Sequence, residues 1–152
     1  MIRKAEEKDL QAAAALASLL WPDHAPEELL PEFRALLESG EGALFLASED
    51  GLDLGFAQAQ LRHDYVEGAE SSPVGYLEGV YVRAEARGRG VARALLQACE
   101  AWAAERGCRE FASDCELDNA ASLSFHLHSG FTEANRIICF VKPLNGDKGG
   151  SA

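Results

Sequence analysis

Apolar residues recur every three or four positions in two segments near the start of the chain, which is the spacing of an α-helix. The first segment covers residues 7–21 and is rich in alanine and leucine, both strong helix formers. A stretch that contains Pro22 and Pro26 interrupts the pattern, which resumes over residues 27–37 and ends before Gly40. We therefore expect two helices at the start of the chain.

Short apolar runs bounded by turn residues follow, and this pattern predicts β-strands that alternate later with helices. A polar stretch over residues 62–75 has neither period, so it predicts a long loop. The predicted strands are residues 43–47, 54–61, 76–82, 110–115 and 137–141, and the later predicted helices are residues 91–106 and 118–130.

This order of elements combines a hairpin with helical crossovers, which predicts a mixed α/β or α+β fold with helices on both faces of one sheet. The length and an apolar fraction of 47% are enough for one core, so we expect a single domain over residues 1–144. The polar, glycine-containing end, residues 145–152, predicts a disordered tail.

The formal net charge of −11 makes nucleic acid and anionic membranes unfavourable partners and favours cationic ligands.

We expect a cytoplasmic protein without a membrane span, because no apolar run reaches about 18 residues and the first residues lack a signal-peptide pattern. The four cysteines have no metal-binding spacing, so we expect reduced packing thiols and no metal site.

The clearest chemical motif is the sequence Arg87-Gly88-Arg89-Gly90, which lies between a predicted strand and a long predicted helix. Glycines let a ligand approach the main chain, and the amides at a helix N-terminus attract anions, so this loop predicts a pyrophosphate site. The nucleotide-hydrolysing and dinucleotide-binding glycine motifs do not match its spacing. A flexible turn whose two arginines only aid solubility is the alternative.

A carboxylate, Glu78, interrupts an otherwise apolar predicted strand, and such a group is costly unless a cation pairs with it. It either binds a substrate ammonium group or pairs with a protein arginine. Asp114 ends the neighbouring strand and should face the same cleft. Trp21 and Tyr65 could supply an aromatic wall for a cationic sugar or could be core residues. Lys4, Arg34 and Arg62 read as solvated surface residues.

The motif Arg87-x-x-Gly90-x-Ala92 resembles the acyl-CoA signature of the GNAT superfamily of N-acetyltransferases, and Asn119, Phe125 and the Gly130-Phe131 pair resemble its second motif. The resemblance implies a mixed, mostly antiparallel sheet and acetyl-CoA as co-substrate. The residues that it assigns to acetyl-CoA are Val80, Tyr81, Val82, Arg87, Gly88, Arg89, Gly90, Val91, Ala92, Arg93 and Asn119. His126 stands where many members have a tyrosine that protonates the departing thiolate, and it is either that acid or a packing residue.

A closer resemblance, to bacterial aminoglycoside 6'-N-acetyltransferases, lies in residues 19–22, 63–68, 71–74, 76–82 and 108–114. It implies a homodimer and an aminoglycoside or other polycationic amine as acceptor. The residues that it assigns to the acceptor are Trp21, Tyr65, Glu78, Asp114 and Asn135. Acetylation of a polyamine or a protein amine, and a CoA-binding module without turnover, are the alternatives.

The mechanism that we expect is direct attack of the acceptor amine on the acetyl thioester. Glu78 would remove the amine proton directly or through water, with Asp114 assisting. A strand irregularity around Gly79 and Val80 would free the Val80 amide for the developing oxyanion. His126 would serve the departing thiolate.

Overall fold

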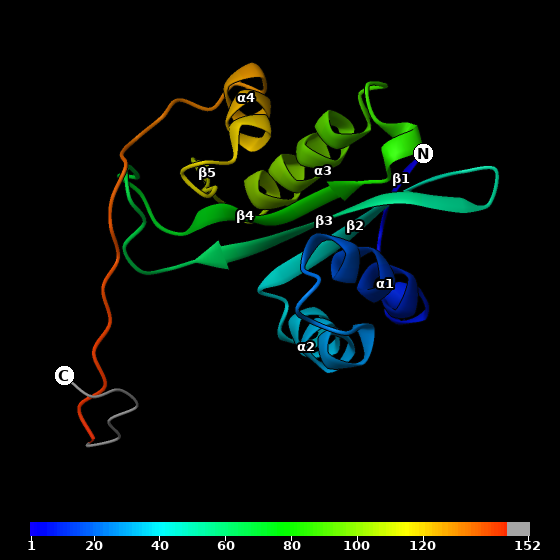
Figure 1. Cartoon of the computed structure of the whole chain (residues 1–152), viewed down its shortest axis with the longest axis horizontal. Coiled ribbons are helices and arrows are strands. Elements are labelled where there is room, and N and C mark those ends of the chain that lie inside the picture. The colour runs from blue at the N-terminus through cyan, green and yellow to red at the C-terminus, as the bar shows by residue number, and fades with distance from the viewer. Residues whose placement is uncertain (146–152) are drawn as a thin grey trace.

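A computed structural model describes residues 1–145 of the chain, and its centre is a five-stranded sheet in which the strands lie in sequence order (Figure 1). The first four strands pair antiparallel, whereas the fifth is parallel to the fourth. The strands are β1 (Ile2–Lys4), β2 (Gly42–Glu49), β3 (Leu52–Arg62), β4 (Val74–Val82) and β5 (Phe111–Ser113). The helices are α1 (Leu10–Leu20), α2 (Pro26–Ser39), α3 (Val91–Glu105) and α4 (Ala120–His128), with short 3-10 turns η1 (Glu7–Asp9) and η2 (Ala84–Ala86).

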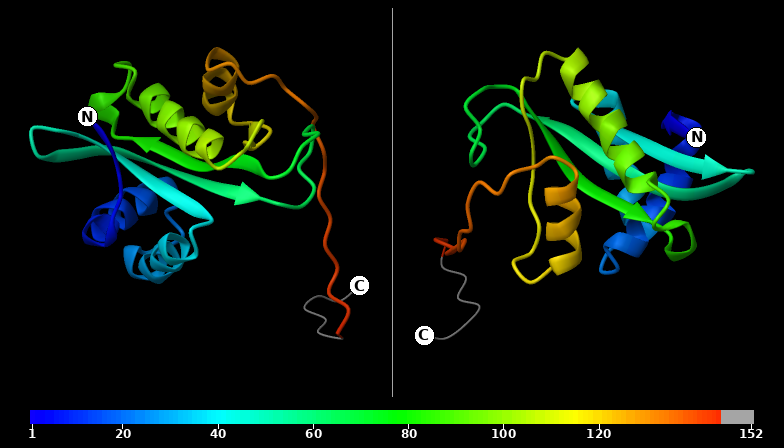
Figure 2. Two further views of the ribbon diagram at one scale, coloured as in Figure 1. Left: turned by 180° about the vertical axis from the view of Figure 1, so that it is seen from behind. Right: turned by 90° about the horizontal axis from the view of Figure 1, so that it is seen from above.

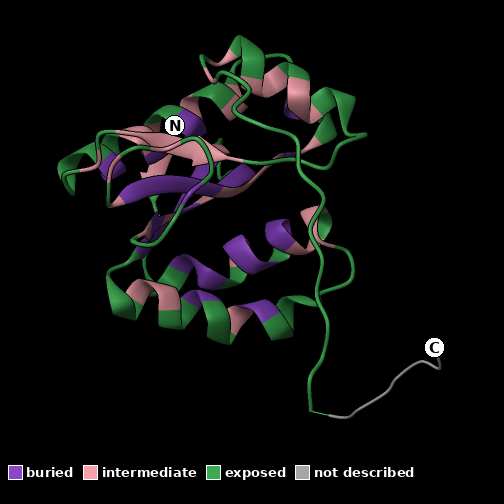
Figure 3. Cartoon of the chain, turned by 90° about the vertical axis from the view of Figure 1, so that its left-hand side faces the viewer, coloured by how far each residue is buried: buried purple, intermediate pink, exposed green. Residues whose placement is uncertain are grey.

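The helices lie on both faces of the sheet, which confirms the predicted mixed α/β class (Figures 1 and 2). Helices α1 and α2 cover one face, where Leu10, Leu16 and Phe33 pack on β2 and β3. Helix α3 covers the other face with Leu95, Cys99 and Trp102. Helix α4 lies beside α3 on the same face. Burial colouring in Figure 3 shows the same arrangement, because the buried residues of the helices turn toward the sheet.

A β-bulge in β4 changes which face its side chains reach. Gln58 of β3 pairs with Gly79 and the next residue, Ala59, pairs with Leu77, so Glu78 has no partner across the ladder. Glu78 and Gly79 therefore both turn toward the α1 and α2 side, whereas strict alternation would place them on opposite faces. The sequence predicted an irregularity at Gly79 and Val80, and the structure has it one residue earlier.

Strands β4 and β5 separate soon after they meet. Their parallel pairing covers only Gly75 to Leu77 on β4 and Phe111 to Ser113 on β5. Beyond Leu77, β4 continues for residues 78–82 with a partner in β3 only, among the residues that the structure describes. The sheet thus opens between its last two strands next to the bulge.

The predicted strand over residues 137–141 is wrong. The chain runs here without regular structure, away from the sheet, as Figures 1 and 3 show. The side chains of Ile138, Phe140 and Val141 are 79%, 90% and 96% exposed. A strand needs a neighbour for its backbone groups, and no segment of residues 1–145 pairs with this one. The predicted disordered tail, residues 145–152, lies outside the described residues except for Asn145.

Candidate active site

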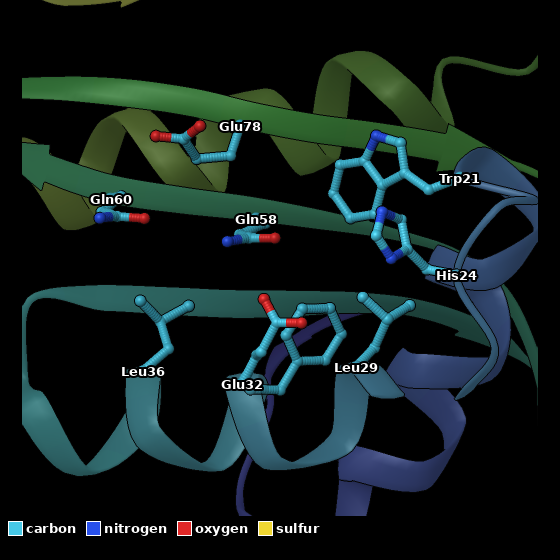
Figure 4. Close-up of a pocket in the computed structure, with 9 residues that line it drawn as sticks. Trp21, His24, Leu29, Glu32, Leu36, Gln58, Gln60 and Glu78 are labelled. Carbon is cyan, nitrogen blue, oxygen red and sulfur yellow. The ribbon is translucent and has the colours of Figure 1, made fainter. Parts of the chain in front are cut away.

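A pocket of about 370 Å³ lies between α2, the end of α1 and the bulged part of the sheet (Figure 4). The Trp21 ring closes one end of it, and the Glu78 carboxylate lies near the other. Its floor, on α2, combines the apolar side chains of Leu29 and Leu36 with Glu32, and the opposite wall is polar. The lining residues are Trp21, His24, Leu29, Glu32, Phe33, Leu36, Gln58, Gln60 and Glu78.

Glu78 pairs with a protein arginine, which was one of the two roles considered for it. Arg62 donates to both carboxylate oxygens, with Nη2 at 3.1 Å from Oε1 and 3.0 Å from Oε2, and Nε at 3.3 Å from Oε2. The side chains of Arg62 and Glu78 are 41% and 21% exposed, so the pair lies at the mouth of the site. The prediction that Arg62 is a solvated surface residue is therefore correct only in its partial exposure, since the side chain is paired with Glu78.

Tyr76 connects this ion pair to Asp114. The Arg62 guanidinium lies 3.5 Å from the centre of the Tyr76 ring, and the Tyr76 hydroxyl donates a hydrogen bond to Asp114 Oδ2. Burial, and then the hydrogen bond to Asp114, raise the pKa of Tyr76 above its ordinary value. The phenol consequently stays protonated and keeps donating. Glu78 and Asp114, which sequence reasoning placed in one cleft, are joined through these two side chains.

The two aromatic residues assigned to the acceptor lie in different surroundings. Trp21 is half-buried, lines the pocket, and packs edge-on against Phe56 with the ring centres 6.0 Å apart. Tyr65 is 79% exposed and does not line the pocket. Its hydroxyl donates to Glu67 at 3.0 Å, and Asn135 Nδ2 donates to the other oxygen of Glu67 at 3.2 Å. Tyr65 and Asn135 thus both bind the Glu67 carboxylate, outside the pocket that Trp21 lines.

The glycine loop has the geometry that an anion site at a helix N-terminus needs. Gly88 and Gly90 have φ values of +77° and +80°, and Gly90 is the N-cap of α3. A Cβ atom built on either residue would meet no protein atom within 4 Å, so the space beside the main chain is open to a ligand. The residues therefore fit a pyrophosphate group bound by backbone amides.

The arginines and the asparagine assigned to acetyl-CoA also hold the loop and α4 in place. Arg87 Nε donates to Val82 O at 2.8 Å, which turns this side chain back along β4. Arg93 donates to His128 O at the end of α4. Asn119 is the N-cap of α4 and accepts a hydrogen bond from the Ser122 amide at 3.0 Å. Arg89 lies at the surface, 3.4 Å from Glu49.

His126 lies on α4, where β4 and β5 begin to separate. Its Nδ1 is 2.7 Å from the carbonyl oxygen of Ser122, so this nitrogen carries a proton and donates it. Its Nε2 is 2.8 Å from Ser113 Oγ, at the last residue of β5. The Ser113 hydroxyl is in turn 3.3 Å from Leu77 O, at the last residue of β4 in that pairing. The Ser113 hydroxyl therefore provides an exchangeable proton at the opening of the sheet, with His126 Nε2 beside it.

Sequence reasoning missed the polar wall of the pocket. Gln58, Gln60 and Arg62 occupy every second residue of β3, so all three face α2 or the pocket mouth, and the alternation was visible in the sequence. His24 and Glu32 could not be found in this way, because they reach the pocket only through the packing of α2 on the sheet. Among residues 1–145 no group of three or more His, Cys, Asp or Glu side chains could hold a metal ion.

Comparison with known families gives a match over most of the chain. Residues 11–131 match the acetyltransferase (GNAT) family. In the part of the chain that the structure describes, no helix is both long enough and apolar enough to cross a membrane.

The relatives carry a common name. The chain is 47% identical over 144 residues to an aminoglycoside N(6')-acetyltransferase type 1 of Stenotrophomonas maltophilia, which covers 94% of this chain and 93% of the relative. It is 40% identical over 141 residues to an enzyme of the same name from Salmonella enteritidis, which covers 93% and 97%.

Solved structures of aminoglycoside acetyltransferases have the same fold as this chain. The aminoglycoside N-acetyltransferase AAC(6')-Iy in complex with CoA superposes with a TM-score of 0.92 at 40% identity, over 95% of both chains. The same enzyme in complex with the bisubstrate analogue CoA-S-monomethyl-acetylneamine gives a TM-score of 0.91 at 40% identity, over 95% of this chain and 98% of that one.

Proposed function

The chain belongs to the acetyltransferase (GNAT) family, and we propose that it is an aminoglycoside 6'-N-acetyltransferase, which transfers the acetyl group of acetyl-CoA to an amine of the antibiotic. The two relatives described above are 47% and 40% identical to it over 93% and 97% of their own length. Acetylation removes a positive charge from the acceptor, and the expected consequence is resistance to the antibiotic.

The observation that carries this proposal is the β4 bulge. It turns the Glu78 carboxylate toward a pocket walled by Trp21, within two residues of the point where β4 and β5 part. An aminoglycoside carries several ammonium groups on sugar rings, and carboxylates and an aromatic face bind such groups. The excess of acidic residues, 25 against 14 basic ones, favours the approach of a polycation.

The chain's own residues suggest how acetyl-CoA is held. We place its pyrophosphate against the amides of Gly88 and Gly90 at the start of α3, and its arm along residues 80–82 of β4, where the sheet is open. The charged side chains of Arg87 and Arg93 are turned toward Val82 and His128. We therefore assign the contacts with the pyrophosphate mainly to the main chain, with Arg89 available beside it.

The bound co-substrate supplies an acetyl thioester, whose carbonyl carbon the amine attacks and whose sulfur leaves as a thiolate. Glu78 accepts the proton of the acceptor amine directly or through water, and Asp114 helps to orient the amine. The Val80 amide, next to the bulge, donates to the oxygen of the acetyl carbonyl as charge develops on it. The sulfur receives the proton of the Ser113 hydroxyl, and His126, protonated on both nitrogens, replaces it by passing its Nε2 proton to Ser113 Oγ, which lies 2.8 Å away.

A different amine acceptor, such as a polyamine or a protein amine, is the second candidate. The pocket carboxylates suit a polyamine as well as an antibiotic. The aromatic ring of Trp21 at one end of the pocket favours the antibiotic, because a sugar ring stacks on it and a linear polyamine does not.

We further propose that residues 1–144 act as one domain and that the enzyme is a homodimer. The support for the dimer is the segment of residues 137–144, whose apolar side chains do not pack against the rest of the chain. Phe140, Val141 and Leu144 are each at least 90% exposed. A second copy would cover them. A cytoplasmic location fits the four free cysteines, two of them exposed, since exposed thiols persist in a reducing compartment.

Steady-state kinetics on Glu78→Gln and Asp114→Asn test the function. Each change removes one charge from the acceptor site, where a charge-assisted hydrogen bond is worth about 1.5–3 kcal/mol, so kcat/KM for kanamycin or tobramycin should fall roughly tenfold to a hundredfold. The affinity for acetyl-CoA should stay near that of the unchanged protein. Asp64→Asn, at an exposed residue outside the pocket, is the control.

Wild-type protein that releases no thiol with either antibiotic would contradict the assignment. So would a normal rate with both variants, since the two carboxylates would then have no part in binding the acceptor. Release of thiol with spermidine alone would favour the polyamine enzyme.

A further inference from the structure

The cation site of Glu78 is filled by the protein itself. Arg62 donates three hydrogen bonds to the two carboxylate oxygens at 3.0–3.3 Å, so the guanidinium already neutralises Glu78 and uses most of the lone pairs that would receive an acceptor's ammonium group. The two residues come from neighbouring strands, since Arg62 is the last residue of β3 and Glu78 lies at the bulge of β4.

Three features make Arg62 displaceable. Its side chain is 41% exposed, so the guanidinium can move into water without crossing packed atoms. An ion pair with this degree of exposure contributes little to stability. Its remaining contact is the Tyr76 ring at 3.5 Å, and that ring is held independently by its hydrogen bond to Asp114.

Resting on the proposed function, we propose that Arg62 is an affinity-determining residue that occupies the place of the acceptor's ammonium group on Glu78. A ligand with an ammonium group at this point replaces the guanidinium by another cation. A ligand with a hydroxyl there cannot neutralise Glu78, so it binds with the ion pair intact. Arg62 therefore lowers the affinity for amine-bearing acceptors specifically. The ammonium group of such an acceptor binds Glu78 only by displacing the Arg62 guanidinium.

Neomycin and paromomycin provide a matched pair of ligands, because they differ in having an amine or a hydroxyl at the 6' carbon. Calorimetry on wild type and Arg62→Gln should give a neomycin affinity that rises about threefold to tenfold in the variant, the range expected for an exposed ion pair and a cation–π contact. Paromomycin affinity should change by less than about twofold, because its 6' hydroxyl does not compete with Arg62 for Glu78, and the change in net charge acts on both ligands and cancels in their ratio. The ratio of the two affinities isolates the local effect.

Two further variants act as controls. Arg34→Gln removes the same charge from another ion pair, 2.7 Å from Glu7 and outside the pocket, and should leave the ratio unchanged. In a Glu78→Gln background, Arg62→Gln should no longer alter the ratio, because the carboxylate for which the two cations compete is gone. Arg62→Lys, which keeps the charge but cannot form two parallel hydrogen bonds, should lie between wild type and Arg62→Gln and replaces the latter if it does not fold.

An unchanged or lower ratio in Arg62→Gln would overturn the inference, and a lower ratio would mean that Arg62 orients Glu78 for the acceptor. Wild-type protein that binds neomycin more tightly than paromomycin but releases no thiol would contradict the proposed function alone. Protein that binds neither antibiotic would overturn both.

Discussion

At the scale of single residues, Gly79 determines where the Trp21 ring can lie. A Cβ atom at residue 79 would be 2.6 Å from Cζ2 of Trp21 and 3.0 Å from Leu20 Cδ2. A real Cβ does not approach another carbon so closely, so the absent side chain is what lets the ring lie against β4. The glycine that follows Glu78 thus sets the position of the aromatic wall of the pocket although it has no side chain.

We predict that Gly79→Ala destabilises the protein by about 1–3 kcal/mol, as overpacking does, and raises the KM for kanamycin because the Trp21 ring must move. Thermal unfolding measures the loss of stability, steady-state kinetics the KM, and tryptophan fluorescence the displacement of the Trp21 ring, while acetyl-CoA affinity should not change. Trp21→Leu combined with Gly79→Ala should cost less than the sum of the single changes, since the smaller side chain vacates the clash. Unaltered unfolding and fluorescence in Gly79→Ala would contradict this account.

The side-chain pairs of the site could be only partly predicted from the sequence. Glu78 was recognisable as a charge in an apolar strand that needs a cation, but the identity of the cation was not. Arg62 becomes its partner only because β3 and β4 pair in one register with a bulge, and register is a property of the two strands together. The link from Tyr76 to Asp114 depends in the same way on the parallel pairing of β4 with β5.

At the scale of elements, the strongly periodic segments were predicted well. Helix α3 buries Leu95, Leu96, Cys99 and Trp102, which recur at helical spacing, and it begins directly after the predicted glycine loop. Strand β1 was missed because three residues are too few to have a period. The strand predicted at 137–141 failed for the opposite reason, since its apolar run was evident but a strand also needs a partner, which an apolar run does not specify.

The start of α3 gives a prediction at this scale. Gly90→Val should lower the affinity for acetyl-CoA at least about tenfold, because a branched side chain would occupy the space that the pyrophosphate needs beside the main chain. Calorimetry on folded variant protein measures it. The open surroundings of Gly90 mean that the loss would not come from a clash within the protein.

Gly107→Val is the matched control for Gly90→Val. Gly107 follows the other end of α3, has a similar φ of +86°, and is equally free of neighbours within 4 Å. Both variants force a branched residue into a left-handed conformation and should lose stability to a similar extent. Only Gly90→Val should lose acetyl-CoA. Equal affinities in the two variants would remove the basis for placing the pyrophosphate at this loop.

At the scale of the whole molecule, the two substrates would approach the sheet from different sides. The pocket with Trp21 and Glu78 lies on the α1 and α2 face, whereas His126 and Ser113 lie on the face that α3 and α4 cover. The bulge and the opening between β4 and β5 connect the two sides. The acceptor amine and the acetyl group would therefore meet at the sheet itself, where the backbone offers donors.

The segment after α4 makes the last prediction, which concerns assembly. It is anchored by the hydrogen bond from Asn135 to Glu67 and then runs on with Ile138, Phe140 and Val141 exposed. Light scattering at micromolar concentration should give the mass of two chains. A second copy that packs on the exposed apolar side chains of this segment would remove them from water. Phe140→Asp with Val141→Asp should give one chain. Leu52→Asp, at an apolar residue that begins β3 and is 66% exposed, should leave the dimer intact. A monomeric wild-type protein would refute the dimer, and a dimeric Phe140→Asp, Val141→Asp variant would place the interface elsewhere.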